Sequence, residues 1–222
     1  MKRIVITGVI LGILGNIQFA GAADLHAAGH AGHSGNVQKN MELSPAEEIL
    51  YAMHQPMMDE PFVESGSVER DFLSNMIPHH QGAVDSAKLY LQYGENKKIR
   101  EMAGAIISAQ EKEIAYFKEL LNDPQALGSV KISKKEYKKF AADEKKNMEQ
   151  MMEAMMDVSF TVTDADRMFA KAMIEHHKGA VAASRQILAY TKDETVRRIA
   201  ETIIADQEKE ISEFQIALMQ IK

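Results

Sequence analysis

The sequence predicts an all-α protein whose core is a four-helix bundle made of two repeated helical hairpins. Apolar residues recur with helical period along most of the chain, and no stretch alternates with the period of a strand. Residues 70–121 align without gaps with residues 167–218, and "MIPHHQGAV" at 76–84 returns as "MIEHHKGAV" at 173–181. Because one hairpin alone cannot bury both its apolar faces, the two are expected to pack together, near-antiparallel.

The N-terminus has the pattern of an export signal. Lys2 and Arg3 precede a long apolar run, and small residues close that run at Ala20 to Ala23. This order is typical of a signal peptide over residues 1–23. The alternative is an uncleaved anchor, because the run approaches the length that spans a bilayer. We expect cleavage, a periplasmic or secreted mature protein, and no membrane association after the signal is removed.

A His-rich tail over residues 24–43 should follow. It is rich in Gly and Ala and lacks periodicity, which predicts flexibility. Its imidazoles are His26, His30 and His33. Cleavage after Ala23 would make His26 the third residue, so the free amine, two amide nitrogens and this imidazole can bind Cu(II) in a square plane. The tail is therefore predicted to capture Cu(II).

A single helical domain is expected over residues 44–222. It opens at Ser44-Pro45-Ala46-Glu47, a capping box with proline at the first helical position. The short helix that follows should end near Pro56, and we interpret it as an appendage. A second capping box at Ser133-Lys134-Lys135-Glu136 opens a helix over 134–157, interpreted as the connection between the two hairpins.

The two repeats follow one plan, a helix, a tight turn and a second helix, over residues 67–121 and 164–221. The likeness extends beyond the opening motif, because "QEKEI" occurs at 110–114 and again at 207–211. Thr163-Asp164-Ala165-Asp166 supplies the start signal of the second repeat. The sequence therefore predicts two equivalent hairpins within one domain.

Composition excludes several classes of function. Asp and Glu (32) outnumber Lys and Arg (26), the net charge is −6, and no basic stripe is visible, so nucleic acid is not an expected partner. The chain has no Cys, no G-x-S-x-G elbow and no Gly-rich phosphate loop, and no enzyme activity is expected. Any soft-metal chemistry must therefore use its 15 Met and its 8 His residues.

Each copy of the repeated motif places one Met beside two adjacent His residues, because residues three and four apart share a helical face. The candidate ligands are Met76, His79 and His80 in the first copy and Met173, His176 and His177 in the second. Adjacent residues diverge by about 100° on a helix, so we expect one His of each pair to face inward and the other outward. Di-iron bundles carry Glu where this chain has Met, and thioether with imidazole suits Cu(I) and Ag(I) better than iron. The alternative is an ordinary core of packed Met and hydrogen-bonded His.

Two further segments concentrate thioethers. In "MEQMMEAMM", five Met residues fall within an arc of about 140° on a helical wheel, which suits a Cu(I)-binding stripe and an apolar core stripe equally. "MHQPMM" mixes thioether and imidazole around Pro56, where a loosely packed appendage would show the same pattern. The candidate ligands are Met53, His54, Met57 and Met58, together with Met148, Met151, Met152, Met155 and Met156.

With these motifs, the chain resembles the CopM-like family of periplasmic copper-binding proteins, long catalogued as a domain of unknown function. The resemblance covers residues 67–221 and is carried by the two Met-x-x-His-His segments and the paired "QEKEI". It implies a ferritin-like four-helix fold, binding of Cu(I), Ag(I) and Cu(II), a role in copper tolerance and no enzyme activity. The family pattern maps onto Met76, His79, His80, Met173, His176 and His177.

The chain departs from the family pattern near the bundle centre. Ser86 and Ala183 stand where the family often has Met, and so do Phe117 and Phe214. Fewer soft ligands remain there, which shifts the expected site toward the Met-rich segments at 53–58 and 148–156.

The sequence therefore predicts a periplasmic or secreted helical protein that sequesters or shuttles Cu(I) in copper homeostasis, with silver as a surrogate. A copper-efflux or chaperone protein is the expected macromolecular partner. Two alternatives stay open. The first is a structural or interaction bundle whose Met stripe docks a partner helix, because Met surfaces repack readily. The second is a carboxylate-type metalloenzyme.

Overall fold

The computed structural model describes residues 43–128, 131–159 and 162–221. Residues 44–222 form one compact unit. The predicted signal peptide and the tail imidazoles His26, His30 and His33 lie outside the described residues. Within the described part, no helix combines the length and apolar character needed to cross a membrane.

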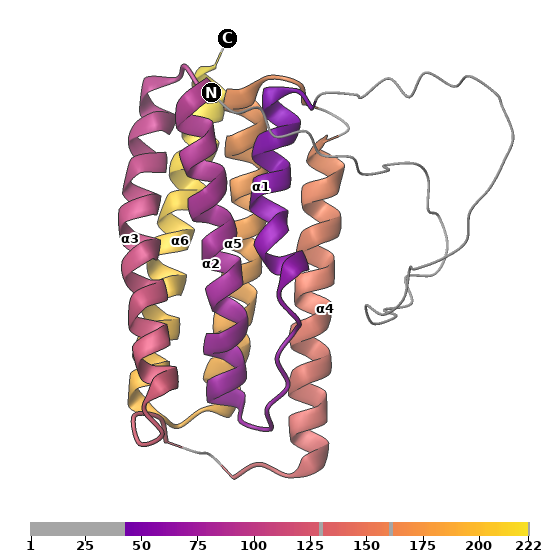
Figure 1. Ribbon diagram of the computed structural model, residues 1–222, viewed down its shortest axis with the longest axis vertical. Coiled ribbons are helices and arrows are strands. Elements are labelled where there is room, and N and C mark those ends of the chain that lie inside the picture. Colours follow the sequence, from indigo (N-terminus) through magenta and orange to yellow (C-terminus); the bar gives the residue numbers. More distant parts are fainter. Residues whose placement is uncertain (1–42, 129–130, 160–161, 222) are drawn as a thin grey trace, which may run out of the picture. The chain divides into compact units, whose positions relative to one another are not determined.

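The described residues form six α-helices and no strand, which confirms the all-α prediction (Figure 1). The helices are α1 (Pro45–Asp59), α2 (Val68–Tyr93), α3 (Lys97–Asn122), α4 (Lys134–Ser159), α5 (Ala165–Tyr190) and α6 (Glu194–Gln220).

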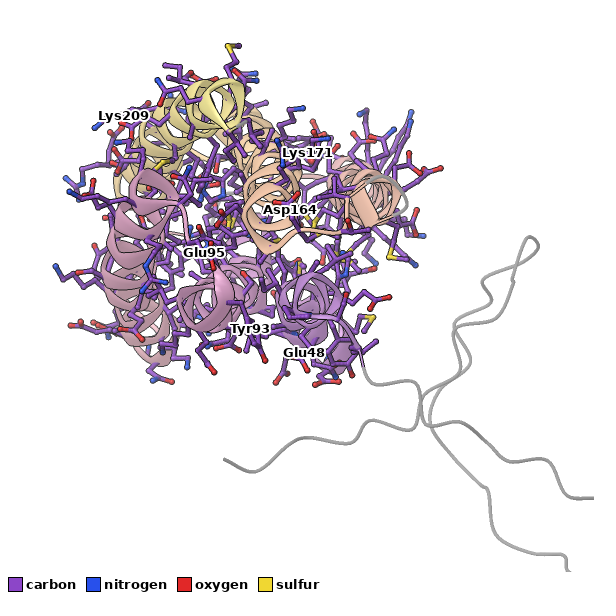
Figure 2. All side chains as sticks on the ribbon, turned by 90° about the horizontal axis from the view of Figure 1, so that it is seen from above. Glu48, Tyr93, Glu95, Asp164, Lys171 and Lys209 are labelled. Carbon is purple, nitrogen blue, oxygen red and sulfur yellow. The ribbon has the colours of Figure 1, made fainter. Side chains whose placement is uncertain are left out.

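The helices lie in two layers of three, one from each half of the sequence, as the view down the bundle shows (Figure 2). In each layer the first helix of the hairpin, α2 or α5, is central. It has its hairpin partner, α3 or α6, on one side and α1 or α4 on the other. The helix over 134–157, expected only as a connection, is therefore the outer helix of the second layer.

The two predicted capping boxes begin α1 and α4. Ser44 Oγ accepts a hydrogen bond from the Glu47 amide at 3.3 Å, and Glu47 accepts one from the Ser44 amide at 2.7 Å. Ser133 and Glu136 make the same reciprocal pair at 3.2 and 2.9 Å. Each box satisfies amide donors that a helix start otherwise leaves without partners.

Helix α1 is longer and better packed than the sequence suggested. It continues through Pro56 to Asp59, and Ile49 and Met53 are fully buried. The Tyr93 hydroxyl at the end of α2 donates a hydrogen bond to Glu48 of α1 at 2.6 Å, at the end of the bundle seen in Figure 2. The expectation of an appendage is therefore wrong, because α1 contributes to the core.

The turns of the two hairpins use the same chemistry. The Arg100 guanidinium donates to the carbonyl oxygens of Leu91 and Gly94, both at 2.8 Å. Arg197, its equivalent in the second repeat, donates to Leu188 and Thr191 at 3.1 and 3.4 Å. A cation at the C-terminal end of a helix satisfies free carbonyls and interacts favourably with the helix dipole.

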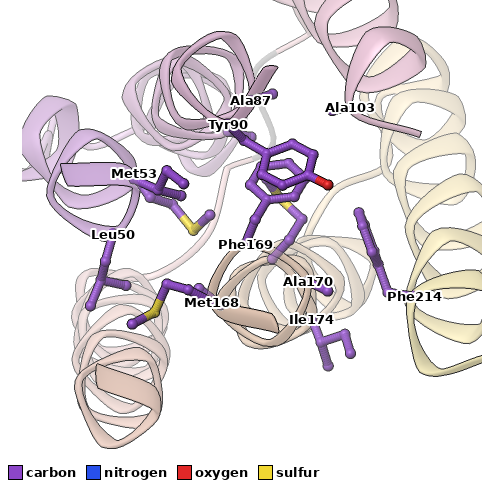
Figure 3. Packing of buried hydrophobic residues seen from close by; sticks show 14 of the residues in the cluster. Leu50, Met53, Ala87, Tyr90, Ala103, Met168, Phe169, Ala170, Ile174 and Phe214 are labelled. Carbon is purple, nitrogen blue, oxygen red and sulfur yellow. The ribbon is translucent and has the colours of Figure 1, made fainter. Parts of the chain in front are cut away.

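One apolar cluster, to which all six helices contribute, is rich in methionine (Figure 3). Its aromatic centre is a stacked pair, Tyr90 and Phe169, with ring centroids 4.3 Å apart, and Phe214 meets Phe169 edge to face. Its buried thioethers are Met53, Met57, Met102, Met151, Met155, Met168 and Met173. Burying such a side chain contributes about 1.5–3 kcal/mol without any metal, so packing alone accounts for part of this set.

Candidate metal-binding site

All four His residues of the repeated motif are buried. The expectation that one His of each pair would face outward is wrong, because α2 and α5 are covered on two sides. The first His of each pair lies at the contact between α2 and α5, and the second faces the hairpin partner α3 or α6.

The second His of each pair meets a carboxylate from the repeated "QEKEI" segment. His80 Nε2 lies 3.0 Å from a Glu113 oxygen, and His177 Nε2 lies 2.8 Å from a Glu210 oxygen. Neither nitrogen is in hydrogen-bonding geometry. Each contact is an ion pair only when the imidazole is protonated. The same His–Glu contact occurs in both halves. It therefore accounts for the repetition of both the His-His motif and the "QEKEI" segment.

The first His residues of the two copies meet each other. The His79 and His176 rings are 3.7 Å apart between centroids and tilted by 35°, and His79 Nε2 is 3.1 Å from the His176 carbonyl oxygen. Burial, followed by neighbouring imidazoles, holds the pKa of both rings well below the usual value. Both rings are therefore neutral near pH 7, the form that binds a metal ion.

A cavity of about 60 Å³ lies between α1, α2, α4 and α5, on the side of the bundle away from α3 and α6. Thioethers from three helices and one imidazole line it: Met57, Met76, His79, Met148 and Met151. The cavity is thus the place where part of the repeated motif meets both Met-rich segments.

Gly179 shapes one wall of this cavity. A Cβ at this position would lie 2.8 Å from Cγ of Met151 and closer still to its sulfur. The missing side chain therefore lets the Met151 thioether approach the backbone of α5. The glycine in "HHKGAV" therefore belongs to the site because it leaves room for one of the cavity thioethers.

A polar wall of the cavity escaped the sequence analysis. Glu144 is only 6% exposed, and one of its carboxyl oxygens has no hydrogen-bond partner. Burial, with a smaller effect from Asp71, raises the pKa of Glu144 to about 8, while a hydrogen bond with Asn75 opposes the shift. Near neutral pH the group is mostly protonated. In the sequence, Glu144 stands out only as one acidic residue within the otherwise apolar stripe of α4. Such a residue is equally typical of a solvent-exposed position that interrupts the stripe.

The remaining predicted ligands are divided between the core and the surface. Met53, Met155 and Met173 are fully buried, as is His54 to within 5%, and none of them lines the cavity. Met152 is half-buried, whereas Met58 and Met156 are exposed. The Met stripe of α4 packs within the chain, since Met151 contacts Gly179 of α5, and this favours core or ligand roles over a free docking face.

The donor set of the cavity is soft. Among the described residues, no three His, Asp or Glu side chains are grouped so that they could hold a metal ion. Thioethers and a neutral imidazole instead suit Cu(I) and Ag(I). The unpartnered Nδ1 of His79 is consistent with a site that accepts a ligand there.

Fold and site together define a class of protein, an internally duplicated helical bundle with a cavity lined by thioether and imidazole groups. The chain belongs to the DUF305 family, a domain of unknown function, whose family profile matches residues 69–218. The resemblance drawn from the repeated motif is thereby confirmed. Helix α1 precedes the matched range. Among curated proteins, none matches this chain.

Solved structures of CopM have a similar fold. CopM in a silver-bound form obtained by soaking is 25% identical with a TM-score of 0.51, over 68% of this chain and 95% of that one. A silver-bound form from co-crystallisation is 24% identical with a TM-score of 0.51, over 68% and 96%. The Cu(I)-bound form is 23% identical with a TM-score of 0.48, over 68% and 96%.

Proposed function

We propose that this protein binds Cu(I), with Ag(I) as a surrogate, in the cavity between α1, α2, α4 and α5. The observation that carries the proposal is the convergence of four thioethers and one neutral imidazole on a single cavity. Soft donors of this kind select soft monovalent ions. The silver-bound form of CopM, 25% identical and similar in fold, supports the same chemistry.

The cavity walls also suit the charge of the ion. Thioethers and a neutral imidazole leave a bound monovalent cation with its full charge, and a buried charge is costly without a compensating group. Glu144 is a buried carboxyl on the same cavity. The carboxyl is mostly protonated near neutral pH in the metal-free protein, and loss of this proton on binding would place a negative charge beside the ion.

The biological role that fits this chemistry is sequestration or shuttling of copper in copper tolerance. The protein acts in the periplasm or outside the cell after the signal over residues 1–23 is removed. Its partner is a copper-efflux or chaperone protein, and His26, His30 and His33 of the tail capture Cu(II). No catalytic role is proposed.

The test compares two triple Met→Leu variants in anaerobic Cu(I) titrations against a competing chelator, followed by native mass spectrometry. Met76→Leu/Met148→Leu/Met151→Leu removes cavity thioethers, and we expect at least about tenfold weaker binding. Met58→Leu/Met156→Leu/Met219→Leu changes exposed residues and should bind as the wild type does. Leucine nearly conserves the volume of methionine, so both variants should keep the fold.

The two variants also separate the alternatives. Equal binding by the cavity variant and the wild type, with intact circular dichroism, would remove the cavity as the site. Absence of competitive Cu(I) uptake by the wild type would favour the interaction bundle instead.

A further inference from the structure

We propose that α1 completes a second Cu(I)- or Ag(I)-binding site, formed by His54 of α1 with His176 and Met173 of α5. None of these three residues lines the cavity described above. The inference rests on the proposed soft-metal function and extends it to a second ion. Helix α1, which supplies His54, lies outside the matched family range.

His54 is a buried imidazole whose Nε2 makes no hydrogen bond within the fold. The side chain is 5% exposed. Burial lowers the pKa of this ring to about 4, so it is neutral near pH 7, and its unpartnered Nε2 can bind a metal. A buried polar atom without a partner costs free energy, which a bound ion would recover.

His176 presents a second such imidazole to α1. The ring is fully buried, and neither of its nitrogens has a hydrogen-bond partner. A Cβ on Gly82 would lie 3.6 Å from His176 Nε2 and would overlap the carbonyl oxygen of Met53. His176 Nε2 therefore reaches the gap between α2 and the backbone of α1, one residue from His54. Proximity of His54 also contributes to the lowered pKa of His176.

Met173 supplies the thioether. It is fully buried and lies three residues before His176, so the two side chains share one face of α5. Two neutral imidazoles and a thioether again form a soft donor set, which Cu(I) and Ag(I) prefer to hard cations.

The duplication relates this second site to the first. Met173 and His176 occupy the positions of Met76 and His79 in the second repeat. Each Met–His pair faces the layer opposite its own. In that layer a glycine of the repeated motif lets an outer helix pack closely: Gly179 contacts α4, and Gly82 contacts α1. The outer helices are themselves alike, since "MHQPMM" at 53–58 matches "MMEAMM" at 151–156. The first site takes outer donors from α4 together with Met57 of α1, and the second takes His54 from α1.

The experiment counts ions by native mass spectrometry of the mature protein loaded anaerobically with Cu(I), and separately with Ag(I), under a competing chelator. His54→Leu should bind one ion fewer than the wild type. His54→Met should restore that ion, because it returns a soft donor where the matching α4 residue is Met152. The cavity variant Met76→Leu/Met148→Leu/Met151→Leu should lose a different ion, so adding His54→Leu to it removes both.

Differences between variants are decisive, because the tail imidazoles are present in every protein compared. An unchanged ion count in His54→Leu, with loss in the cavity variant, would overturn the second site and leave the proposed function standing. Absence of competitive uptake by the wild type would overturn the proposed function itself. Far-UV circular dichroism and thermal unfolding establish that each variant is folded. If His54→Leu does not fold, Met173→Leu carries the test, because it removes the thioether at nearly constant volume and should also bind one ion fewer.

Discussion

Replacing Gly82 with alanine is expected to lower the free energy of unfolding by about 3 kcal/mol. The new Cβ would lie 3.1 Å from the carbonyl carbon of Met53 and overlap its oxygen. These atoms belong to the backbone of α1, which a rotamer change cannot move aside. The whole helix would have to shift, and with it the apolar cluster that contains Ile49 and Met53. Equilibrium unfolding in urea measures the change.

Two other helical glycines provide matched controls. A Cβ on Gly104 of α3 meets nothing within 4 Å, so Gly104→Ala should stabilise the protein by about 0.5–1 kcal/mol through helix propensity. A Cβ on Gly179 meets the flexible side chain of Met151, so Gly179→Ala should cost less than Gly82→Ala. Equal effects at Gly82 and Gly104 would contradict the close packing of α1 on α2.

Replacing Glu144 with glutamine is expected to remove a pH dependence of stability. The pKa of Glu144 is about 8 in the folded protein against an ordinary value of 4.5, chiefly because the group is buried. The folded state therefore binds more protons than the unfolded state across this interval, and the free energy of unfolding falls as pH rises through it. Glutamine does not titrate, so the variant should gain roughly 4–5 kcal/mol over the wild type above pH 8.

Urea unfolding of the metal-free proteins at about pH 5 and about pH 9 measures this difference. The control is Glu153→Gln, which changes an exposed glutamate on the same helix and should leave the wild-type slope intact. Parallel stability curves for the wild type and Glu144→Gln would show that the carboxyl is not buried as described.

The helices could be predicted because their signals are local. The capping boxes at Ser44 and Ser133 and the apolar period depend only on residues a few positions apart. The packing of α1 could not, because it depends on one missing side chain at Gly82 in a different helix. The predicted end of α1 at Pro56 was also wrong, since the helix continues through this proline for three more residues.

The candidate site could be predicted by residue type and only partly by position. Helical period places Met76 on the same face as His79, but it does not tell which faces of four helices enclose a common space. That depends on the layering of the bundle, which selects Met57 and Met151 for the cavity and leaves Met58 at the surface. The two His residues of each pair were misassigned for the same reason, because a central helix is covered by both neighbours in its layer and by the opposite layer, so two adjacent residues can both be buried.

The contact between His79 and His176 has a consequence for the history of the chain. The two residues are equivalents in the two repeats, and equivalent residues touch where a two-fold axis passes between them. The arrangement is that of an isologous homodimer whose subunits have been joined end to end. Fusion frees each half to diverge, as Pro78 and Glu175 already have, or His54 and Met152. A symmetric ancestor could offer only two identical pockets, whereas the two proposed sites of the fused chain can differ in affinity.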